Sequence, residues 1–311
     1  MQGKVTAAKS VVAVLVVCLC AAAAQASVTD KSPSISAFNP WSPVNMAVET
    51  SVDRTLAAGA KLPHAGMCDF SSWSLFTDYT FGSNQDKRNG GFDNNFNSYT
   101  IGADTLYNTN TLWGFMVNNN ESQDHMKGVN NNRVTTESWT YSLYVSQPVN
   151  EWMSWGTSFS YGTSEIKQKG VAGTTDADSY VIAPYLAMYK QIDKLTLSMS
   201  PSYVLGYQEL DYPAGNVPND DTGLMGRFVL MNRASYALTE KLNISANLNF
   251  NQVLHNHGLD GVVDNDHQWW TTGAKLGYKF TSNLSGSVGY STEFDSDYDS
   301  DIWSMGLAYM F

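Results

Sequence analysis

Large apolar side chains recur at every second position in twelve separate segments of this chain. In the last nine residues the alternating apolar positions are Trp303, Met305, Leu307, Tyr309 and Phe311, and the small residues Ser304, Gly306 and Ala308 lie between the first four. Alternation with a period of two is typical of a β-strand that has one apolar face and one small or polar face. The predicted strands span Trp73–Phe81, Tyr99–Tyr107, Trp113–Val117, Trp139–Val145, Met153–Tyr161, Tyr180–Met188, Leu195–Tyr207, Phe228–Leu238 (interrupted at Asn232), Leu242–Phe250, Trp270–Phe280, Leu284–Phe294 and Trp303–Phe311.

The predicted connections between these strands are alternately short and long. Tight turns are expected at 108–110, 148–151, 192–194, 239–241 and 281–283, and longer polar loops at 82–95, 120–133, 163–177, 208–224, 254–266 and 295–300. Short periplasmic turns, long outer loops and an even strand number are typical of transmembrane barrels with both termini on the periplasmic side. We therefore expect an all-β fold over residues 70–311, a transmembrane antiparallel up-and-down β-barrel of about 12 strands. A secreted β-sandwich or a soluble repeat protein would explain the strands but not the alternating loop lengths.

The amino-terminal residues have the pattern of a secretory signal peptide. Lys4 and Lys9 precede an apolar run over 11–20, and Ala24-Gln25-Ala26 offers a cleavage site. The run is too short to cross a membrane. Lipidation at Cys18 or Cys20 is the alternative, but no small residue precedes either cysteine. Cleavage after residue 26 would leave Cys68 alone, without an internal disulfide.

Charge and hydropathy narrow the possible partners. The chain has a net charge of −11, and loss of the signal peptide removes two lysines and no acid. Binding to nucleic acid that is driven by counterion release is therefore excluded. The mean hydropathy of −0.27 is compatible with a membrane barrel, because lipid-facing and lumen-facing residues alternate and average out. Aromatic residues make up 13% of the chain and suit the girdles at membrane interfaces. Trp113, Tyr144 and Trp152, which lie near short turns, are expected in the inner girdle.

Residues 27–69 form a segment that is too short for a folded domain. Ser42-Pro43 is typical of a helix start and Gly59 of a stop, so a helix is expected at about 44–58, followed by a linker. Its length would be roughly 23 Å, close to the height of the apolar band of a barrel. The helix can therefore stand inside the pore, although a periplasmic or surface helix is an open alternative. Its apolar stripe consists of Val44, Val48, Val52 and Leu56.

The order of these elements resembles the translocator domain of autotransporters. The motifs that carry the resemblance are Tyr99-Thr-Ile-Gly-Ala-Asp104, Trp113-Gly-Phe115, Trp155-Gly-Thr-Ser-Phe-Ser-Tyr-Gly162 and the closing aromatic strand. The resemblance covers roughly residues 43–311 and implies a barrel with a helix in its pore that exports a passenger. About fifteen residues precede the helix after the signal peptide, so a relative without a substantial passenger is expected. The resemblance also implies that the barrel-assembly machinery reads the last strand, through Trp303, Leu307, Tyr309 and Phe311.

Charged residues on the small-polar face are predicted to line the pore. They are Asp78, Asp104, Arg227, Arg233, Lys275 and Glu293, together with Lys279. Charges in a lumen can set ion selectivity or pair with a plug. Glu49 and Arg54 on the predicted helix are the candidate partners within this chain.

Two acidic loops are weak candidates for metal binding. The first groups His255, His257, Asp264, Asp266 and His267, residue types that bind transition metals. The second spaces Asp295, Asp297 and Asp299 at every other residue, which suits calcium. Neither matches a fixed ligand signature, so no metal or other cofactor is expected. A hydrolase would need Ser291 and His267 at the outer rim, but enzyme motifs are otherwise lacking.

Three functions follow from this pattern. The first is an autotransporter-type pore or surface-exposed membrane protein of the bacterial outer membrane. The second is adhesion or interaction through acidic outer loops, and the third is an outer-membrane hydrolase. The expected partners are outer-membrane lipid and lipopolysaccharide and the assembly machinery, with no nucleic acid, and the barrel is expected to be monomeric.

Overall fold

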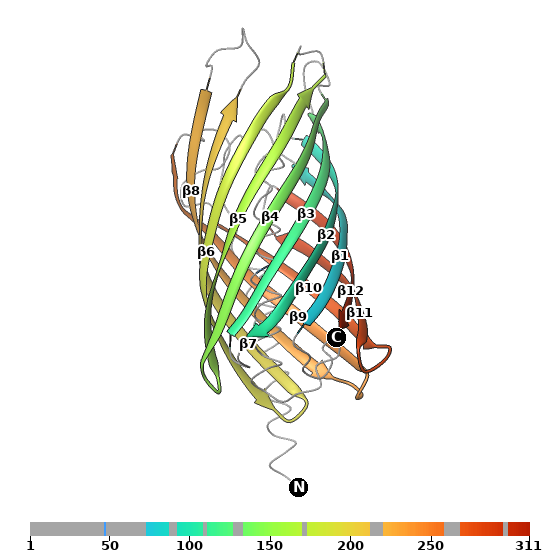
Figure 1. The fold of residues 1–311 in the computed structure, drawn as a ribbon. Coiled ribbons are helices and arrows are strands. Elements are labelled where there is room, and N and C mark those ends of the chain that lie inside the picture. The colour runs from blue at the N-terminus through green and yellow to red at the C-terminus, as the bar shows by residue number, and fades with distance from the viewer. Residues whose placement is uncertain are drawn as a thin grey trace.

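The computed structural model describes residues 47, 73–86, 92–107, 111–126, 133–169, 173–211, 220–257, 268–294 and 298–311. Twelve strands lie in these ranges (Figure 1). They are β1 (Trp73–Asp86), β2 (Phe92–Tyr107), β3 (Thr111–Met126), β4 (Arg133–Asn150), β5 (Met153–Gln168), β6 (Thr175–Ile192), β7 (Leu195–Asp211), β8 (Asp220–Ala237), β9 (Leu242–His257), β10 (Gln268–Lys279), β11 (Leu284–Phe294) and β12 (Tyr298–Met310). The predicted all-β class and strand number are confirmed.

The strands form one closed antiparallel barrel in chain order. Each strand pairs with its neighbours in the sequence, and β1 pairs with β12 from Ser74↔Met310 to Asp86↔Tyr298. The backbone amide of Phe311 also donates to the carbonyl of Trp73, at 3.1 Å, across this seam. Closure leaves no sheet edge, so the strands satisfy their backbone groups without water, which spanning a bilayer requires.

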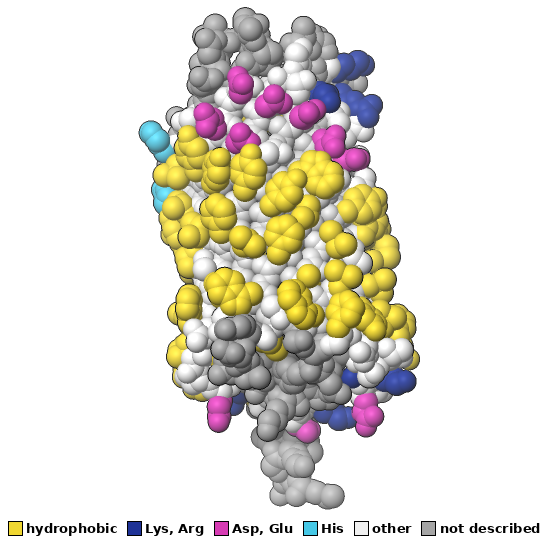
Figure 2. All heavy atoms as spheres, in the orientation of Figure 1, with side chains coloured by type: hydrophobic (Ala, Val, Ile, Leu, Met, Phe, Trp, Pro, Cys, Tyr) yellow, Lys and Arg dark blue, Asp and Glu magenta, His cyan; other side chains and the backbone are white. Residues whose placement is uncertain are grey.

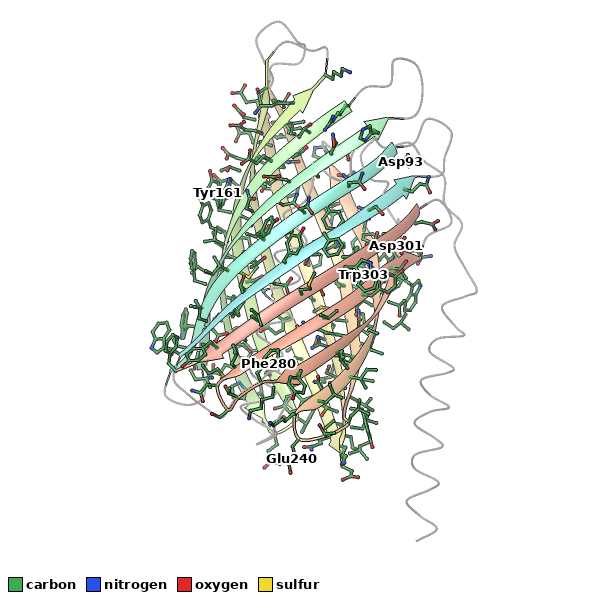
Figure 3. The ribbon with its side chains drawn as sticks, turned by 90° about the vertical axis from the view of Figure 1, so that its right-hand side faces the viewer. Asp93, Tyr161, Glu240, Phe280, Asp301 and Trp303 are labelled. Atoms are coloured by element: carbon green, nitrogen blue, oxygen red, sulfur yellow. The ribbon has the colours of Figure 1, made fainter. Side chains whose placement is uncertain are left out.

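Alternate residues face outward and inward along each strand, as the period of two predicts. In β4 the exposed and buried positions alternate over twelve consecutive residues. Every strand carries exposed large apolar side chains at outward positions. On the face shown in Figure 2 they form an apolar belt, with charged side chains beyond it at both ends. Figure 3 shows Phe280 near the turn end, with Glu240 beyond it, and Asp93 at the opposite end. This belt is the surface that a lipid bilayer covers.

The connections differ from the prediction in length. The tight turns after β4, β6, β8 and β10 lie at one end, and Asp193 in the second has a positive φ of 56°, which Asp tolerates better than most residues. At the other end the strands run further than predicted: β3 continues to Met126 and β6 begins at Thr175. The predicted long loops are therefore too long. Beyond the bilayer a strand has no lipid-facing apolar side, so the alternation that marks it in the sequence disappears.

The predicted interruption of the eighth strand is wrong, because β8 passes through Asn232 without a break. The Asn232 side-chain amide donates to the carbonyl of Leu248 at 3.0 Å, and the Asn249 side-chain oxygen accepts from the Asn232 backbone amide at 3.3 Å. These bonds satisfy a polar residue that would otherwise be costly in the wall. The one irregularity in the β8–β9 pairing lies at Gly226/Arg227.

Apart from Ala47, residues 1–72 lie outside the described residues. The predicted signal peptide at 1–26 and linker belong to this part of the chain. The helix predicted at 44–58 is described only at Ala47, which is helical. Within the described ranges, no helix is long and apolar enough to cross a membrane.

Candidate functional site

The inward face of the barrel wall is mostly small and polar. Buried inward residues include Ser74, Ser98, Thr100, Asn118, Ser142, Ser146, Ser158, Ser160 and Ser202. Many bond across strands: the Asn118 amide donates to the hydroxyls of Ser98 at 2.7 Å and Thr100 at 2.8 Å, and the hydroxyls of Ser142 and Ser160 are 2.7 Å apart. Such a wall suits a polar content rather than a hydrocarbon core.

Inward-facing aromatics lie over glycines on the next strand. Phe76 pairs with Gly102, Tyr144 with Gly114 and Tyr185 with Gly156. A Cβ atom on Gly114 would be 1.9 Å from Cζ of Tyr144, so only glycine allows the ring to lie against the wall. The expectation that Tyr144 belongs to the inner girdle is therefore wrong. Tyr144 is out of phase with the outward residues of β4, and this parity was the signal that could have placed it inside.

Ala47 lies inside the barrel, in one buried apolar cluster with inward side chains of β1, β3 and β4. It is helical and 0% exposed, and it belongs to one buried cluster with Phe76, Leu112, Met116 and Tyr144. Each of these four side chains points into the lumen, because each alternates with an exposed outward neighbour. Sequence reasoning missed this apolar patch and a second one on the inner face of β6 to β9, which consists of Val181, Ala183, Tyr185, Ala187, Tyr189, Val204, Met225, Val229 and Val253.

The six charged residues predicted to line the pore all lie on the inward face. Asp78 and Asp104 lie on β1 and β2, Arg227 and Arg233 on β8, Lys275 on β10 and Glu293 on β11. Since β2 and β8 are six strands apart in the ring, the aspartates and the arginines occupy opposite walls. Asp124 on β3, 1% exposed, adds to the acidic side, and Lys279 on β10 adds to the basic side.

Charged residues on both walls interact with neighbouring side chains. The Thr80 hydroxyl donates to Asp78 at 2.9 Å, and the Tyr144 hydroxyl donates to Asp104 at 3.3 Å. The Arg227 guanidinium lies 5.5 Å from the ring centre of Trp269 and interacts electrostatically with Glu293. Stacking on an aromatic face is a common way to hold a buried arginine.

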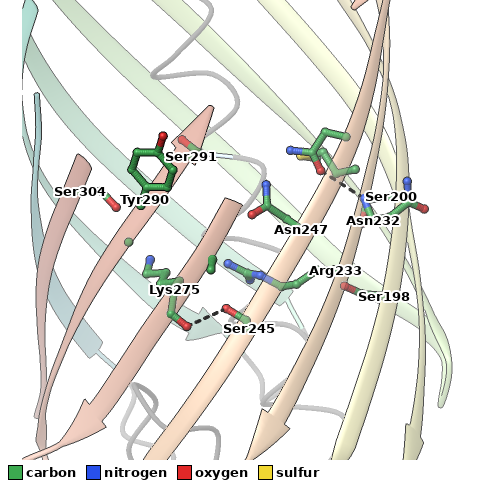
Figure 4. Close-up of a pocket in the computed structure, with 14 residues that line it drawn as sticks. Ser198, Ser200, Asn232, Arg233, Ser245, Asn247, Lys275, Tyr290, Ser291 and Ser304 are labelled. Carbon is green, nitrogen blue, oxygen red and sulfur yellow. Dashed lines mark hydrogen bonds between the residues drawn. The ribbon is translucent and has the colours of Figure 1, made fainter. Parts of the chain in front are cut away.

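A polar pocket opens from the lumen into the wall formed by β7 to β12 (Figure 4). Its volume is about 150 Å³. Arg233 and Lys275 extend toward this space from β8 and β10, on either side of Ser245 and Asn247 of β9. The remaining polar lining comes mostly from the side chains of Ser198, Ser200, Asn249, Ser291 and Ser304.

The outer surface carries tyrosines at the border between the apolar belt and the polar rim. The hydroxyl of Tyr161 donates to Asp178 at 2.9 Å, that of Tyr79 donates to Asn97 at 2.9 Å, and that of Tyr290 donates to Asp301. An apolar ring with a polar tip suits this interface. Figure 3 shows Tyr161 and the pair Trp303 and Asp301 on the outside of the wall.

A row of carboxylates follows directly above the belt. Glu121, Glu137, Glu165, Asp176 and Asp211 face each other across β3 to β7 in direct register, and all are exposed. Figure 2 shows acidic side chains gathered at this level. The Lys167 ammonium lies 3.0 Å from Glu165, and this carboxylate raises the pKa of Lys167 above its ordinary value.

The weak metal candidates do not form a described ligand group. Asp264, Asp266, His267, Asp295 and Asp297 lie outside the described residues. Among the described ones, His255 lies over Gly226 with its ring nitrogens 3.5 Å from the Tyr203 hydroxyl, while His257 ends β9 and Asp299 pairs with Gln85. No group of three or more potential ligands occurs among residues that the structure describes.

The two residues proposed for a hydrolase are not placed together in the part of the chain that the structure describes. Ser291 lines the lumenal pocket rather than the outer rim, and its proposed partner His267 is not among the described residues. The lining of the pocket contains no histidine in the part of the chain that is described.

The terminal strand has the alternation that the sequence predicts. Trp303, Leu307, Tyr309 and Phe311 are exposed on the outer face. The rings of Tyr309 and Phe311 meet edge to face at 5.1 Å. This strand ends at the same end of the barrel as the tight turns (Figure 1).

Comparison with solved structures defines the class of the protein. The translocator domain of the autotransporter NalP from Neisseria meningitidis matches with a TM-score of 0.67 and 14% identity, over 86% of this chain and 97% of that domain. The β domain of the Bordetella autotransporter BrkA matches with a TM-score of 0.59 and 11% identity, over 78% of this chain and all of that one. An outer-membrane channel from Pseudomonas putida F1 matches with a TM-score of 0.55 and 9% identity, over 78% of this chain and 96% of that chain. The chain therefore has the twelve-stranded fold of autotransporter translocator domains, a fold shared with outer-membrane channels.

Sequence comparison adds a short match. A stretch of 59 residues is 41% identical to outer membrane protein P1 of Haemophilus influenzae, covering 19% of this chain and 12% of that protein. No protein-family model matches the sequence. The fold, the apolar belt and this match all indicate a bacterial outer-membrane β-barrel. The structural neighbours are translocators and a channel, proteins that are typically not enzymes.

Proposed function

We propose that this protein is an outer-membrane pore of autotransporter type whose lumen is closed by a helix from its own N-terminal segment. The observation that carries the proposal is Ala47, a helical residue fully buried in the lumen against Phe76, Leu112, Met116 and Tyr144. In this proposal residues 1–26 direct export across the inner membrane and are removed, and residues 44–58 form the plug.

The side chains of the wall are small enough to leave space in the lumen, which supports a pore that a separate helix closes. Most inward residues are serine, threonine, asparagine, alanine or glycine, and three large inward rings on β1 to β6, those of Phe76, Tyr144 and Tyr185, lie against glycines instead of projecting across the barrel. A wall of this kind leaves room for a helix about 10 Å across. The apolar cluster around Ala47 then provides a hydrophobic contact surface for the helix on the wall formed by β1, β3 and β4.

Single-channel recording tests the proposal. The refolded mature protein is expected to conduct rarely in a planar bilayer, and a variant lacking residues 27–66 to form a stably open channel. Heat-modifiable migration on gels checks that both forms have closed barrels. Equal conductance of the two forms would place the helix outside the lumen, and silence of both would rule out a pore.

Cysteine cross-linking tests the position of the helix independently. Ala47→Cys combined with Met116→Cys is expected to cross-link under oxidation, because both side chains belong to the same lumenal cluster. The matched control is Ala47→Cys with Phe115→Cys, since Phe115 is the adjacent residue on β3 and faces outward. Both pairs are made in a Cys68→Ser background. Cross-linking through Phe115→Cys, or through neither partner, would contradict a helix seated in the lumen.

A further inference from the structure

The pocket between β7 and β12 concentrates hydrogen-bond donors around two positive charges. Arg233 and Ser245 belong to neighbouring strands, and Ser245 lies directly opposite Lys275 on the next strand. The hydroxyl of Ser245 donates to the backbone carbonyl of Lys275 at 3.5 Å, which ties β9 to β10 beneath the two cationic side chains. Asn247, Ser291 and Ser304 add further neutral donors around the same space.

The electrostatics of the pocket favour an anion. Arg233 and Lys275 both line it, whereas none of its described lining residues is acidic. The buried acids Asp104 and Asp124 lie on β2 and β3, across the barrel, whereas Asp78 on β1 interacts electrostatically with Lys275, and Glu293 on β11 with Arg227. An anionic group that enters the pocket therefore meets the positive charges of Arg233 and Lys275, which line it, while the described acids lie outside the lining.

Small residues keep the space between the charges open. Lys275 lies opposite Gly289 on β11, and a Cβ atom on Gly289 would be 2.7 Å from the Ser304 hydroxyl and 3.6 Å from Cγ of Lys275. Ala274 and several serines complete the lining. The volume of about 150 Å³ suits a small group rather than a large solute.

We propose that this pocket is a carboxylate-binding subsite of the lumen wall. The planar guanidinium of Arg233 provides paired N–H donors that match a carboxylate, Lys275 provides a second charge, and Ser245 and Asn247 lie between them. The carboxylate comes either from a small dicarboxylic acid in the lumen or from an acidic side chain of this chain, with Glu49 and Asp53 the nearest acids to Ala47 in the sequence. The subsite deepens the proposed pore and rests on it, because the pore is what brings the ligand to this wall.

Calorimetric titration with succinate tests the subsite on the refolded mature protein in neutral detergent. Arg233→Gln and Lys275→Gln are each expected to weaken binding by about tenfold or more, because a charge-assisted hydrogen bond is lost. Lys279→Gln is the matched control, since Lys279 is on the inward face of the same strand but does not line the pocket. Arg233→Lys keeps the charge without the planar fork, and it provides a second variant if Arg233→Gln does not refold.

The source of the carboxylate is resolved by a second variant, Glu49→Gln with Asp53→Asn. If the unaltered protein binds succinate and Arg233→Gln weakens that binding, the result supports a free acid as the ligand. If succinate binds only after Glu49 and Asp53 are neutralised, and this binding again requires Arg233, the result supports a carboxylate of this chain as the natural occupant of the subsite. Absence of binding to every variant, or binding that Arg233→Gln and Lys275→Gln leave unchanged, overturns the subsite. A barrel that binds succinate in this way but never conducts would instead contradict the proposed pore.

Discussion

Single residues inside the barrel show how a wall can carry aromatics and still leave a lumen. Tyr144 is 2% exposed, although it faces the interior of a hollow fold. Its ring lies over Gly114, its hydroxyl donates to Asp104, and its other neighbours include Ala47. The glycine removes the Cβ atom that would push the ring into the lumen. A ring and a glycine on neighbouring strands thus form one packing unit.

Replacing Gly114 with alanine tests this unit. The added methyl group would overlap the Tyr144 ring, so the ring must leave its position and lose its contacts. We expect a loss of about 1–3 kcal/mol in the free energy of unfolding, as for other overpacked sites. Denaturant titration in detergent micelles, followed by tryptophan fluorescence, measures it.

Gly162→Ala is the matched control for this substitution. The one atom within 3.0 Å of its added methyl group is the hydroxyl of Ser179, which can rotate away, so we expect a change within about 0.5 kcal/mol. Equal effects at Gly114 and Gly162 would show that the ring does not depend on the glycine.

The sequence places individual side chains on the right face but does not identify their partners. Alternation predicts that Arg233 and Lys275 face inward, because parity depends only on the strand that carries them, and both line the lumenal pocket. Their common pocket depends on the register of three strands, from Arg233↔Asn247 to Ser245↔Lys275. That register is set by pairings across turns, which one chain's hydrophobic pattern does not specify. The apolar seat of Ala47 escaped prediction for the same reason.

For the strands, the sequence predicted the number correctly but not the full length. All twelve strands were found where the bilayer imposes an apolar face. Their outer ends were missed in β3, β4, β5 and β6, where most of the residues that project beyond the belt are polar. The projecting ends bring Glu121, Glu137 and Glu165 into direct register. Carboxylates directly opposite each other repel and destabilise the sheet.

Neutralising the middle of this row should stabilise the barrel. Glu137 faces Glu121 on one side and Glu165 on the other, so Glu137→Gln removes repulsion with both. We expect a gain of about 0.2–1 kcal/mol at low ionic strength that disappears in high salt, where the repulsion is screened. Denaturant titrations at two salt concentrations give the difference. Glu240→Gln, in the turn after β8, is the control and should show no salt-dependent gain; a gain at Glu137 that persists in high salt would contradict the repulsion.

The last strand combines barrel closure with a role that we propose in assembly. Phe311 is 67% exposed and contributes only its backbone amide to the seam with Trp73. Its side chain is therefore available to the assembly machinery. We expect Phe311→Ala to lower the amount of folded protein in the outer membrane of cells severalfold while refolding in detergent proceeds as before. Phe280→Ala, which removes an exposed aromatic at the same end of the barrel, is the control; equal losses in cells for both would contradict a specific signal at the terminus.

At the scale of the whole molecule, the barrel has two unlike ends and two unlike inner walls. The tight turns and the carboxyl terminus share one end, and the strands project with their carboxylates at the other. Inside, the aspartates of β2 and β3 lie across the barrel from the arginines of β8. The first asymmetry could be predicted from loop lengths along the chain. The second needed the closed ring, because only closure in chain order places β2 opposite β8.

The unlike ends predict the orientation of the barrel in the membrane. In barrels of this kind the tight turns face the periplasm and the longer connections face outward. Lys169, after β5, and Lys194, in the turn before β7, are both exposed at opposite ends. In a Cys68→Ser background, Lys169→Cys should react with a membrane-impermeant maleimide in intact cells. Lys194→Cys should react only after the outer membrane is permeabilised. The reverse pattern would mean that the carboxylate row faces the periplasm. Labelling of both sites in intact cells would mean that the reagent crosses the outer membrane. A periplasmic protein with an engineered cysteine is the control for such leakage.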